Sequence, residues 1–218
     1  MKKVLIILVC LLLVVGCSSK KEETKEEVKE KFVLEKIDDS KDLVYETDYK
    51  SVEVSNKPYE LKILTVNIKG ENIENVNKEL KNFVVNSFKN YQVYEGILVQ
   101  GNVINHDYYV TDDYISIIQR YYMSVDTMVG DKKENVYVIS LKTGRTLDNE
   151  AILKEFDLSK DDLEKKVTNK LDSTEADFEL MNFKQGEYNL YINGDNKLCI
   201  IFNVEEDLQT IKKELILD

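Results

Sequence analysis

The sequence contains few of the residues that most catalytic and metal sites require. It has one histidine, three cysteines, one proline and no tryptophan in 218 residues. One histidine cannot complete the ligand set of a usual zinc site, and Cys199 is the only cysteine after residue 17, so it has no partner for an intrachain disulfide. The sequence has no Gly-x-Ser-x-Gly elbow and no glycine-rich phosphate loop. We therefore predict that the protein is not an enzyme and that it has no metal and no cofactor.

The histidine and the acidic clusters do not form a recognisable site either. His106 lies in a polar stretch where we expect a solvated loop, although counting alone leaves a Ser-His-Asp triad open. Cys199 lies in an apolar run, where we expect a small buried residue. Three acidic clusters lack the spacing of a calcium-binding loop: Asp112-Asp113, Asp161-Asp162 and Glu205-Glu206-Asp207.

A short basic start and an apolar run open the chain. Lys2 and Lys3 precede twelve unbroken apolar residues, 4–15. A membrane-spanning helix needs about 20 such residues, whereas the central region of a secretory signal has roughly 7 to 15. The run ends in Val14-Val15-Gly16-Cys17, which resembles the lipobox of bacterial lipoproteins. The resemblance implies that residues 1–16 are a signal peptide and that lipidated Cys17 anchors the protein to the outer face of the cell membrane. An ordinary signal peptide with an incidental cysteine is the alternative.

The segment that follows Cys17 is polar and electrically neutral. Residues 18–31 contain five lysines and five glutamates, and Val28 is their one aliphatic residue. Such a segment cannot bury enough apolar surface to offset the entropy of ordering. Most of its i,i+4 pairs carry like charges, which weaken a helix. We interpret residues 17–31 as a lipidated cysteine with a solvated tether, and a partly helical stalk is the alternative.

The excess negative charge belongs to residues 32–218, which carry 23 basic and 36 acidic residues and therefore a net charge of −13. A domain of this charge should repel nucleic acid and attract cationic partners, although solubility alone also explains it. We therefore expect no nucleic-acid partner.

The pattern of residues 32–218 predicts one α+β domain, with submodules at 41–100 and 101–218 as the alternative division. Apolar residues recur every three or four positions from Ile73 to Tyr91, which predicts one long helix, and shorter helices are expected at 151–156 and 159–171. Strands are expected at 52–54, 61–68, 108–110, 114–123, 135–141, 188–192, 197–202 and 214–217. The predicted fold class is thus α+β, a mixed or antiparallel sheet with one long N-terminal helix and shorter helices.

Tyrosine is the one enriched side chain, and five of its thirteen copies crowd the stretch from Tyr108 to Tyr122. In a strand over 114–124, Tyr121 faces one side with Ile115 and Ile117, and Tyr122 faces the other. Tyrosine suits both half-buried sheets and binding surfaces. If the strand presents a binding surface, Tyr121 and Tyr122 are the candidate anchors.

Three motifs resemble, in order, a pair of extracellular modules of unknown function. They are Tyr59-Glu-Leu-Lys-Ile-Leu-Thr-Val-Asn-Ile68 with the helix after it, Val136-Tyr-Val-Ile-Ser-Leu-Lys-Thr-Gly-Arg-Thr-Leu147, and the hairpin at 188–202. The modules occur in a peptidoglycan deacetylase and in the lysozyme-sensing anti-sigma-V factor. The resemblance covers most of residues 45–218 and implies a domain shaped like an ATPase subdomain of the heat-shock chaperones, without a nucleotide site. The loop Val129-Gly130-Asp131-Lys132 departs from the family pattern. The resemblance therefore implies an outward-facing binding domain, and neither sigma-factor signalling nor deacetylation.

We therefore expect a membrane-anchored extracellular lipoprotein with a non-catalytic binding domain. The resemblance and the negative charge make a cationic protein such as lysozyme the candidate partner, and a cell-wall component is the other. An accessory or structural protein of the cell envelope, or a factor that binds or modifies cell-wall glycan, is the alternative function.

Overall fold

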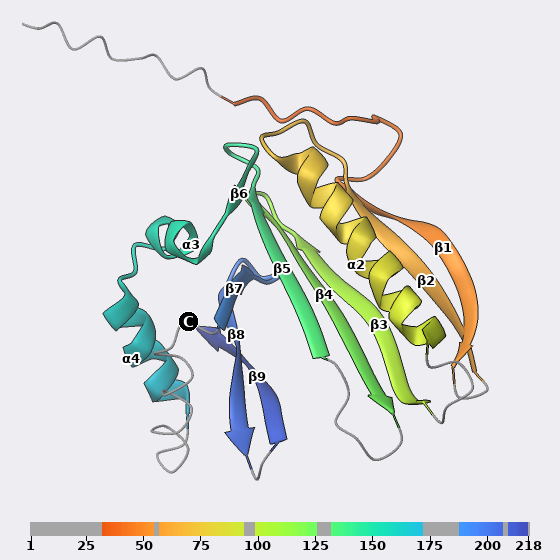
Figure 1. Cartoon of the computed structure of the whole chain (residues 1–218). Helices are drawn as coiled ribbons and strands as arrows, with labels where there is room; N and C mark the ends of the chain where they lie inside the picture. The colour runs from red at the N-terminus through yellow and green to blue at the C-terminus, as the bar shows by residue number, and fades with distance from the viewer. Residues whose placement is uncertain are drawn as a thin grey trace, which may run out of the picture. The chain divides into compact units, whose positions relative to one another are not determined.

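Most of the described chain is antiparallel β-sheet, as Figure 1 shows for this computed structural model. The structure describes residues 32–54, 57–93, 99–125, 132–171, 188–206 and 209–217. Within them, nine strands form sheets of two, four and three strands, and three helices pack around these sheets. All of these residues belong to one unit, Phe32–Asp218. The expected signal peptide, Cys17 and the tether lie outside the described residues.

The predicted α+β class is wrong, and the long helix expected from Ile73 to Tyr91 follows two strands instead of standing at the N-terminus of the described chain. Antiparallel strands dominate the described residues, and their first elements are β1 (Val44–Val54) and β2 (Lys57–Val66), paired as a hairpin. The sequence predicted only the end of β1, because Glu46, Asp48 and Lys50 interrupt its apolar residues. A strand with one face toward water accepts such charges, so the pattern underestimated the share of strand.

The helix α2 (Ile73–Val93) follows the hairpin and covers it. Its buried apolar side chains form one stripe, made of Ile73, Val76, Leu80, Phe83, Val84 and Phe88. Near its start, the Asn77 side chain donates to the Val66 carbonyl at 2.9 Å and accepts from the Val66 amide at 2.7 Å. These two bonds fix the register between α2 and the end of β2.

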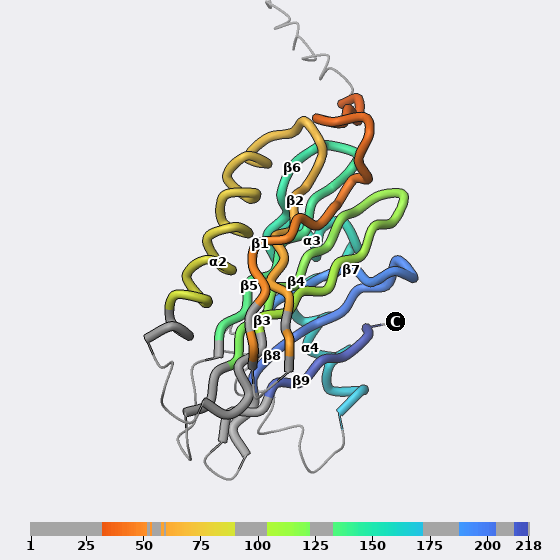
Figure 2. The backbone as a smooth tube through the Cα atoms, turned by 90° about the vertical axis from the view of Figure 1, so that its right-hand side faces the viewer, coloured from red at the N-terminus to blue at the C-terminus, as the bar shows by residue number. Residues whose placement is uncertain are grey.

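The central sheet has the order β3 (Val99–Val110), β4 (Tyr114–Val125), β5 (Lys132–Ser140) and β6 (Arg145–Leu147). Alternation along β4 divides the core between two faces. Ile115 and Ile117 pack with the α2 residues, whereas Tyr114 and Ile118 pack with the C-terminal strands. Figure 2 shows α2 on one side of the central strands and the C-terminal sheet on the other.

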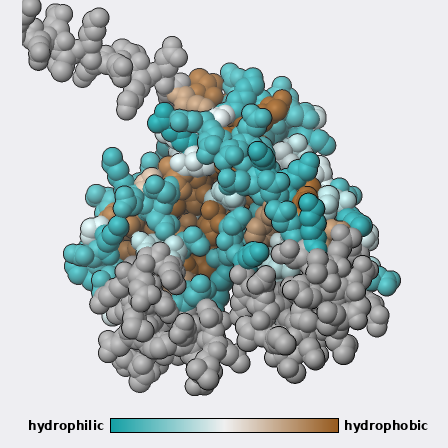
Figure 3. Space-filling model, viewed as in Figure 1, coloured by the Kyte–Doolittle hydropathy of each residue, from teal (hydrophilic) through white to brown (hydrophobic). Residues whose placement is uncertain are grey.

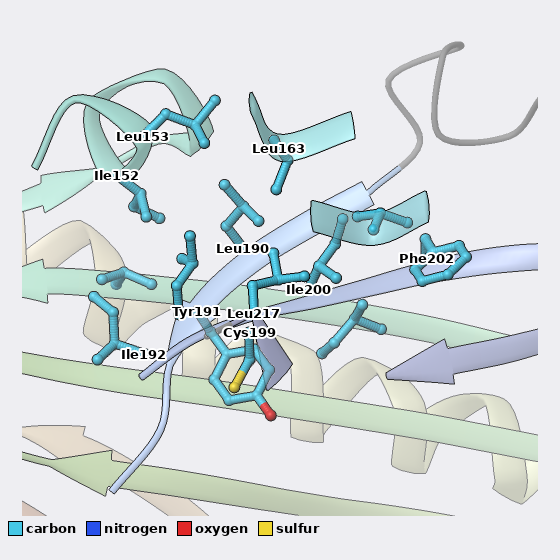
Figure 4. Packing of buried hydrophobic residues seen from close by; sticks show 14 of the residues in the cluster. Ile152, Leu153, Leu163, Leu190, Tyr191, Ile192, Cys199, Ile200, Phe202 and Leu217 are labelled. Atoms are coloured by element: carbon cyan, nitrogen blue, oxygen red, sulfur yellow. The ribbon is translucent and has the colours of Figure 1, made fainter. Parts of the chain in front are cut away.

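The C-terminal sheet has the order β7 (Tyr188–Ile192), β8 (Leu198–Glu206) and β9 (Gln209–Leu217). Helices α3 (Asn149–Glu155) and α4 (Lys160–Lys170) pack against it, and Figure 4 shows their apolar side chains meeting those of the strands. Two predictions are confirmed here. β7 and β8 form the expected hairpin, and Ser159 begins α4 with the expected capping box.

The segment before β1 is held closely to the rest of the domain. The buried Asn67 side chain donates to the carbonyl of Asp38 at 2.7 Å and accepts from the Asp38 amide at 2.8 Å. The Lys69 amide donates to the Glu35 carbonyl at 2.8 Å, and Lys36 forms a bridge with Ile68. The entering backbone is thus fixed by hydrogen bonds.

Among the described helices, none is long and apolar enough to cross a membrane.

Candidate functional site

One half of β5 has an open edge among the described residues. β5 pairs with β4 over its whole length, whereas β6 pairs only with Val138, Ile139 and Ser140. In the described part of the chain, no strand pairs with the outer edge of residues 132–137. Such an edge presents backbone N–H and C=O groups to an incoming chain.

A groove of about 660 Å³ lies between this open edge and α2. We call it the α2–β5 groove, and it is lined by Glu79, Asn82, Phe83, Asn86, Ser87, Lys133, Glu134, Asn135 and Tyr137. Among the helical members, Phe83 belongs to the apolar stripe, and Glu79, Asn82 and Asn86 recur beside it at intervals of three and four residues. On β5, Lys133, Asn135 and Tyr137 alternate along the strand and therefore share a face.

The lining is rich in groups that hydrogen-bond. The Tyr137 hydroxyl donates to a Glu79 carboxylate oxygen at 2.8 Å, and Asn75 donates to the other oxygen at 2.9 Å. Burial raises the pKa of the Tyr137 phenol well above its ordinary value, and the bond to Glu79 raises it further. The phenol is therefore a donor at neutral pH. Asn82 and Asn86 are exposed, and amides offer both donors and acceptors.

Ion pairs hold the strand that forms one wall of the groove. The Glu134 side chain is 7% exposed, and its carboxylate lies 2.7 Å from Lys212 Nζ and 3.3 Å from Arg120 Nε. Arg120 also pairs with Asp107 and, at 3.2 Å, with Glu214. The network joins β3, β4, β5 and β9. A well-compensated carboxylate of this kind stiffens the wall rather than serving as an open charge.

Apolar side chains lie beside the groove on the same face of the molecule. Figure 3 shows them gathered between α2 and the two short helices, over β5 and β7. Val136 points to the face of β5 opposite to Asn135 and Tyr137, is half-buried and packs against the C-terminal core. The face therefore combines an open strand edge, polar side chains and an apolar neighbour, which is the composition of a protein-binding surface.

The structure separates the two tyrosines that the sequence proposed as anchors. Tyr121 is 1% exposed and packs with Leu61, Phe83 and Ile104 in the core. Tyr122 is 38% exposed. Tyr121 is thus not available to a partner in this structure, and the two rings do not form one surface patch.

The other residues that the sequence analysis considered, His106 and Cys199, contact or pack against other parts of the fold. His106 lies within β3 instead of a loop, and its Nε2 lies 2.9 Å from a Glu46 oxygen. This contact and, after it, the contact with Lys62 lower the pKa of Glu46. Cys199 is fully buried, as predicted. Among the described residues, no group of three or more acidic, histidine or cysteine side chains is arranged to hold a metal.

The groove residues were missed because a polar helix face carries no special signal. Glu79, Asn82 and Asn86 follow the helical repeat beside the apolar stripe, a pattern that most solvent-facing helices also show. The departing loop at 129–131 and Cys17 lie outside the described residues. A comparison of the sequence with known family models and with curated proteins finds no match.

Proposed function

We propose that the chain is an extracellular lipoprotein, anchored at Cys17, whose folded domain binds a cationic protein without catalysis. The observation that carries the proposal is the α2–β5 groove, which lies between an open strand edge and a helix and contains several groups that hydrogen-bond. Extended segments bind other proteins by adding a strand to such an edge, with side-chain contacts supplying specificity. Lysozyme is the first candidate partner, on the resemblance of the quoted motifs.

The charge of the domain supports a cationic partner. Residues 32–218 carry −13, so the field of the domain would attract a basic protein and raise its association rate. At the groove, Glu79 is exposed, whereas the Glu134 carboxylate is already compensated by Lys212 and Arg120. Charge alone gives weak and unspecific association, so the backbone edge and the amides must supply specificity.

The test is titration calorimetry of the chain from residue 17 onward with hen lysozyme at physiological salt. We expect binding that Asn86→Arg weakens by about tenfold or more, because the new side chain places bulk and positive charge in the groove. Asn169→Arg makes the same change on the exposed surface of α4 and should leave affinity unaltered. Absence of binding at tens of micromolar would refute lysozyme as the partner, and equal affinities of the two variants would refute the groove as the site.

A second function, binding of cell-wall glycan, is favoured by the amides and the phenol that line the groove. Such groups pair with sugar hydroxyls, and neutral hydrogen bonds respond little to salt. Soluble peptidoglycan fragments are the matching probe. Affinity for these fragments that persists at 1 M salt, where the Debye length is about 3 Å, indicates glycan binding. Affinity for lysozyme that collapses at the same salt concentration indicates binding of the cationic protein.

The anchor needs its own measurement. We expect Cys17→Ala to leave the precursor uncleaved or to release the protein from the membrane, because the thiol is the site of lipidation in the proposed mechanism. Partition into detergent and mass spectrometry of the mature N-terminus distinguish these states. Wild-type partition of the Cys17→Ala protein would refute lipid anchoring.

A further inference from the structure

Exposed aliphatic side chains gather where the chain enters the domain. Val33, Leu34 and Ile37 are 70%, 41% and 60% exposed. Eight large apolar residues are exposed among the described residues, and these three fall within only five consecutive positions. Figure 3 shows this apolar group at the end of the domain where the chain enters. We call these three residues the entry patch.

The backbone that carries the entry patch is held in place. Lys69 and Ile68 bond the backbone at Glu35 and Lys36, and Asn67 bonds Asp38. The exposure of the patch is therefore a property of the folded domain. A group of exposed apolar side chains that folding holds in one place is a candidate contact site for a protein or a membrane.

The place of the patch in the chain indicates what that surface is. Only Phe32 separates Val33 from the tether of residues 18–31, whose contour reaches at most about 45–50 Å at ~3.3–3.6 Å per residue. If Cys17 is lipidated, the patch is the part of the domain that lies nearest to the anchor along the chain. A short tether keeps it at a high effective concentration near the bilayer.

The charges around the patch are compatible with lipid headgroups without requiring anionic lipid. Glu35 pairs with Lys69 at 2.9 Å, and the Lys36 ammonium donates to the Lys41 carbonyl at 2.7 Å. Residues 32–42 carry two lysines and four acidic residues, so electrostatic attraction to an anionic surface is not the driving force. Aliphatic side chains contribute by burial at the boundary between headgroups and acyl chains.

We propose that Val33, Leu34 and Ile37 insert into the outer surface of the membrane that holds the lipid anchor. The inference rests on the proposed lipid anchor. The anchor and the patch then act together, because a lipid chain and a protein contact on one bilayer reinforce each other. The contact fixes which end of the domain faces the membrane.

The absence of tryptophan from the sequence makes a clean probe possible. The lipidated chain with Leu34→Trp is reconstituted into phosphatidylcholine vesicles, with and without brominated acyl chains that quench tryptophan on contact. The matched control is Tyr122→Trp. Tyr122 has a similar exposed fraction to Leu34 but lies on β4, outside the entry patch. A second variant adds Val33→Asp and Ile37→Asp to Leu34→Trp. Because both positions are exposed, we expect this variant to keep the fold.

We expect the Leu34→Trp protein to sediment with vesicles and to be quenched at least about twofold more than the Tyr122→Trp protein. The added aspartates should lower quenching to the level of the control while the protein still sediments. Sedimentation with equal quenching of Leu34→Trp and Tyr122→Trp overturns the inference and leaves the anchor intact. Protein that stays in the supernatant refutes the lipid anchor itself, and the inference with it. Blue-shifted Leu34→Trp emission without vesicles also overturns it, because the chain itself would then cover the patch.

Discussion

Gly144 offers the sharpest test of how the entering segment is attached to the domain. Gly144 has φ of +65°, and a Cβ added there would lie 2.4 Å from two ring carbons of Phe32. Gly144→Ala therefore meets two separate penalties. The left-handed backbone costs about 1–2 kcal/mol for a residue with a Cβ. The half-buried Phe32 ring must also leave its position, which we set at about 1 kcal/mol from the burial of part of an aromatic side chain.

The expected loss for Gly144→Ala is thus about 2–3 kcal/mol in the free energy of unfolding. Urea denaturation followed by circular dichroism measures it, with an unchanged m value as the sign that the folded state keeps its extent. Gly194→Ala is the matched control. A Cβ at Gly194 would meet only a ring carbon of Tyr109 at 3.7 Å, an ordinary contact, so its effect should stay within about 0.5 kcal/mol.

A double-mutant cycle separates the two penalties. In a Phe32→Ala background the ring is absent, so Gly144→Ala should cost only the backbone term, and the two changes should be non-additive by about 1 kcal/mol. Additivity within about 0.3–0.5 kcal/mol would show that Phe32 does not rest on Gly144. In that case the contact between the entering segment and the turn between β5 and β6 would not contribute to stability.

Gly70→Ala should lower the free energy of unfolding by about 1–3 kcal/mol in the same denaturation experiment, because the added Cβ would lie 2.3 Å from the backbone oxygen of Gly144. Phe32→Ala should not relieve this loss, because the clash is with backbone and not with the Phe32 ring. Ser159→Ala should cost about 1 kcal/mol through loss of the α4 capping box, whereas a change below about 0.3 kcal/mol would mean that water replaces the cap. Tyr137 has a raised pKa in the folded state, so its contribution to stability is complete below the unfolded pKa of about 10 and is lost as the pH rises through the folded pKa. Stability measured between pH 9 and 12 should therefore fall less steeply in Tyr137→Phe than in the wild type, and parallel curves would contradict the assignment.

Short-range patterns in the sequence predicted the elements whose signals are local. The α2 stripe, the Ser159 cap and the turn between Tyr188–Ile192 and the next strand depend on neighbours within a few positions, and the structure has each of them. Cys199 was also placed correctly, because an apolar strand in a sheet covered on both sides buries every residue.

The fold class failed because strand pairing is not local. β1, β3 and β9 contain lysines, glutamates and asparagines between their apolar residues, so only the apolar ends of these strands were recognised. Their polar residues are satisfied by partners far along the chain, as His106 is by Glu46 and Lys212 is by Glu134. No pattern within one segment can report such a partner, and the strand content was underestimated as a result.

The strand pattern of the sequence was already enough to show that Tyr121 and Tyr122 do not form one binding surface. Alternation along one strand already placed Tyr121 and Tyr122 on opposite faces, so a single binding surface could hold at most one of them. Whether the Tyr121 face is covered depends on α2, which reaches it from more than thirty positions earlier in the chain and brings Phe83 against it. The sequence predicted both the strand and the helix, but not that they pack together.

The two proposed surfaces fall at different ends of the same helix. The entering segment is tied to residues that directly precede α2, such as Asn67 and Lys69, whereas the groove involves α2 from Glu79 onward. Along the helix axis, Glu79 and Ser87 lie about 9 Å and 21 Å from Ile73, at 1.5 Å per residue. A domain that rests on the bilayer through Val33, Leu34 and Ile37 would therefore hold the open edge of β5 away from the lipid. In that orientation a basic protein arriving from outside meets the groove without first displacing the membrane contact. Anchoring and capture can then proceed at the same time, which is what a tethered binding protein requires.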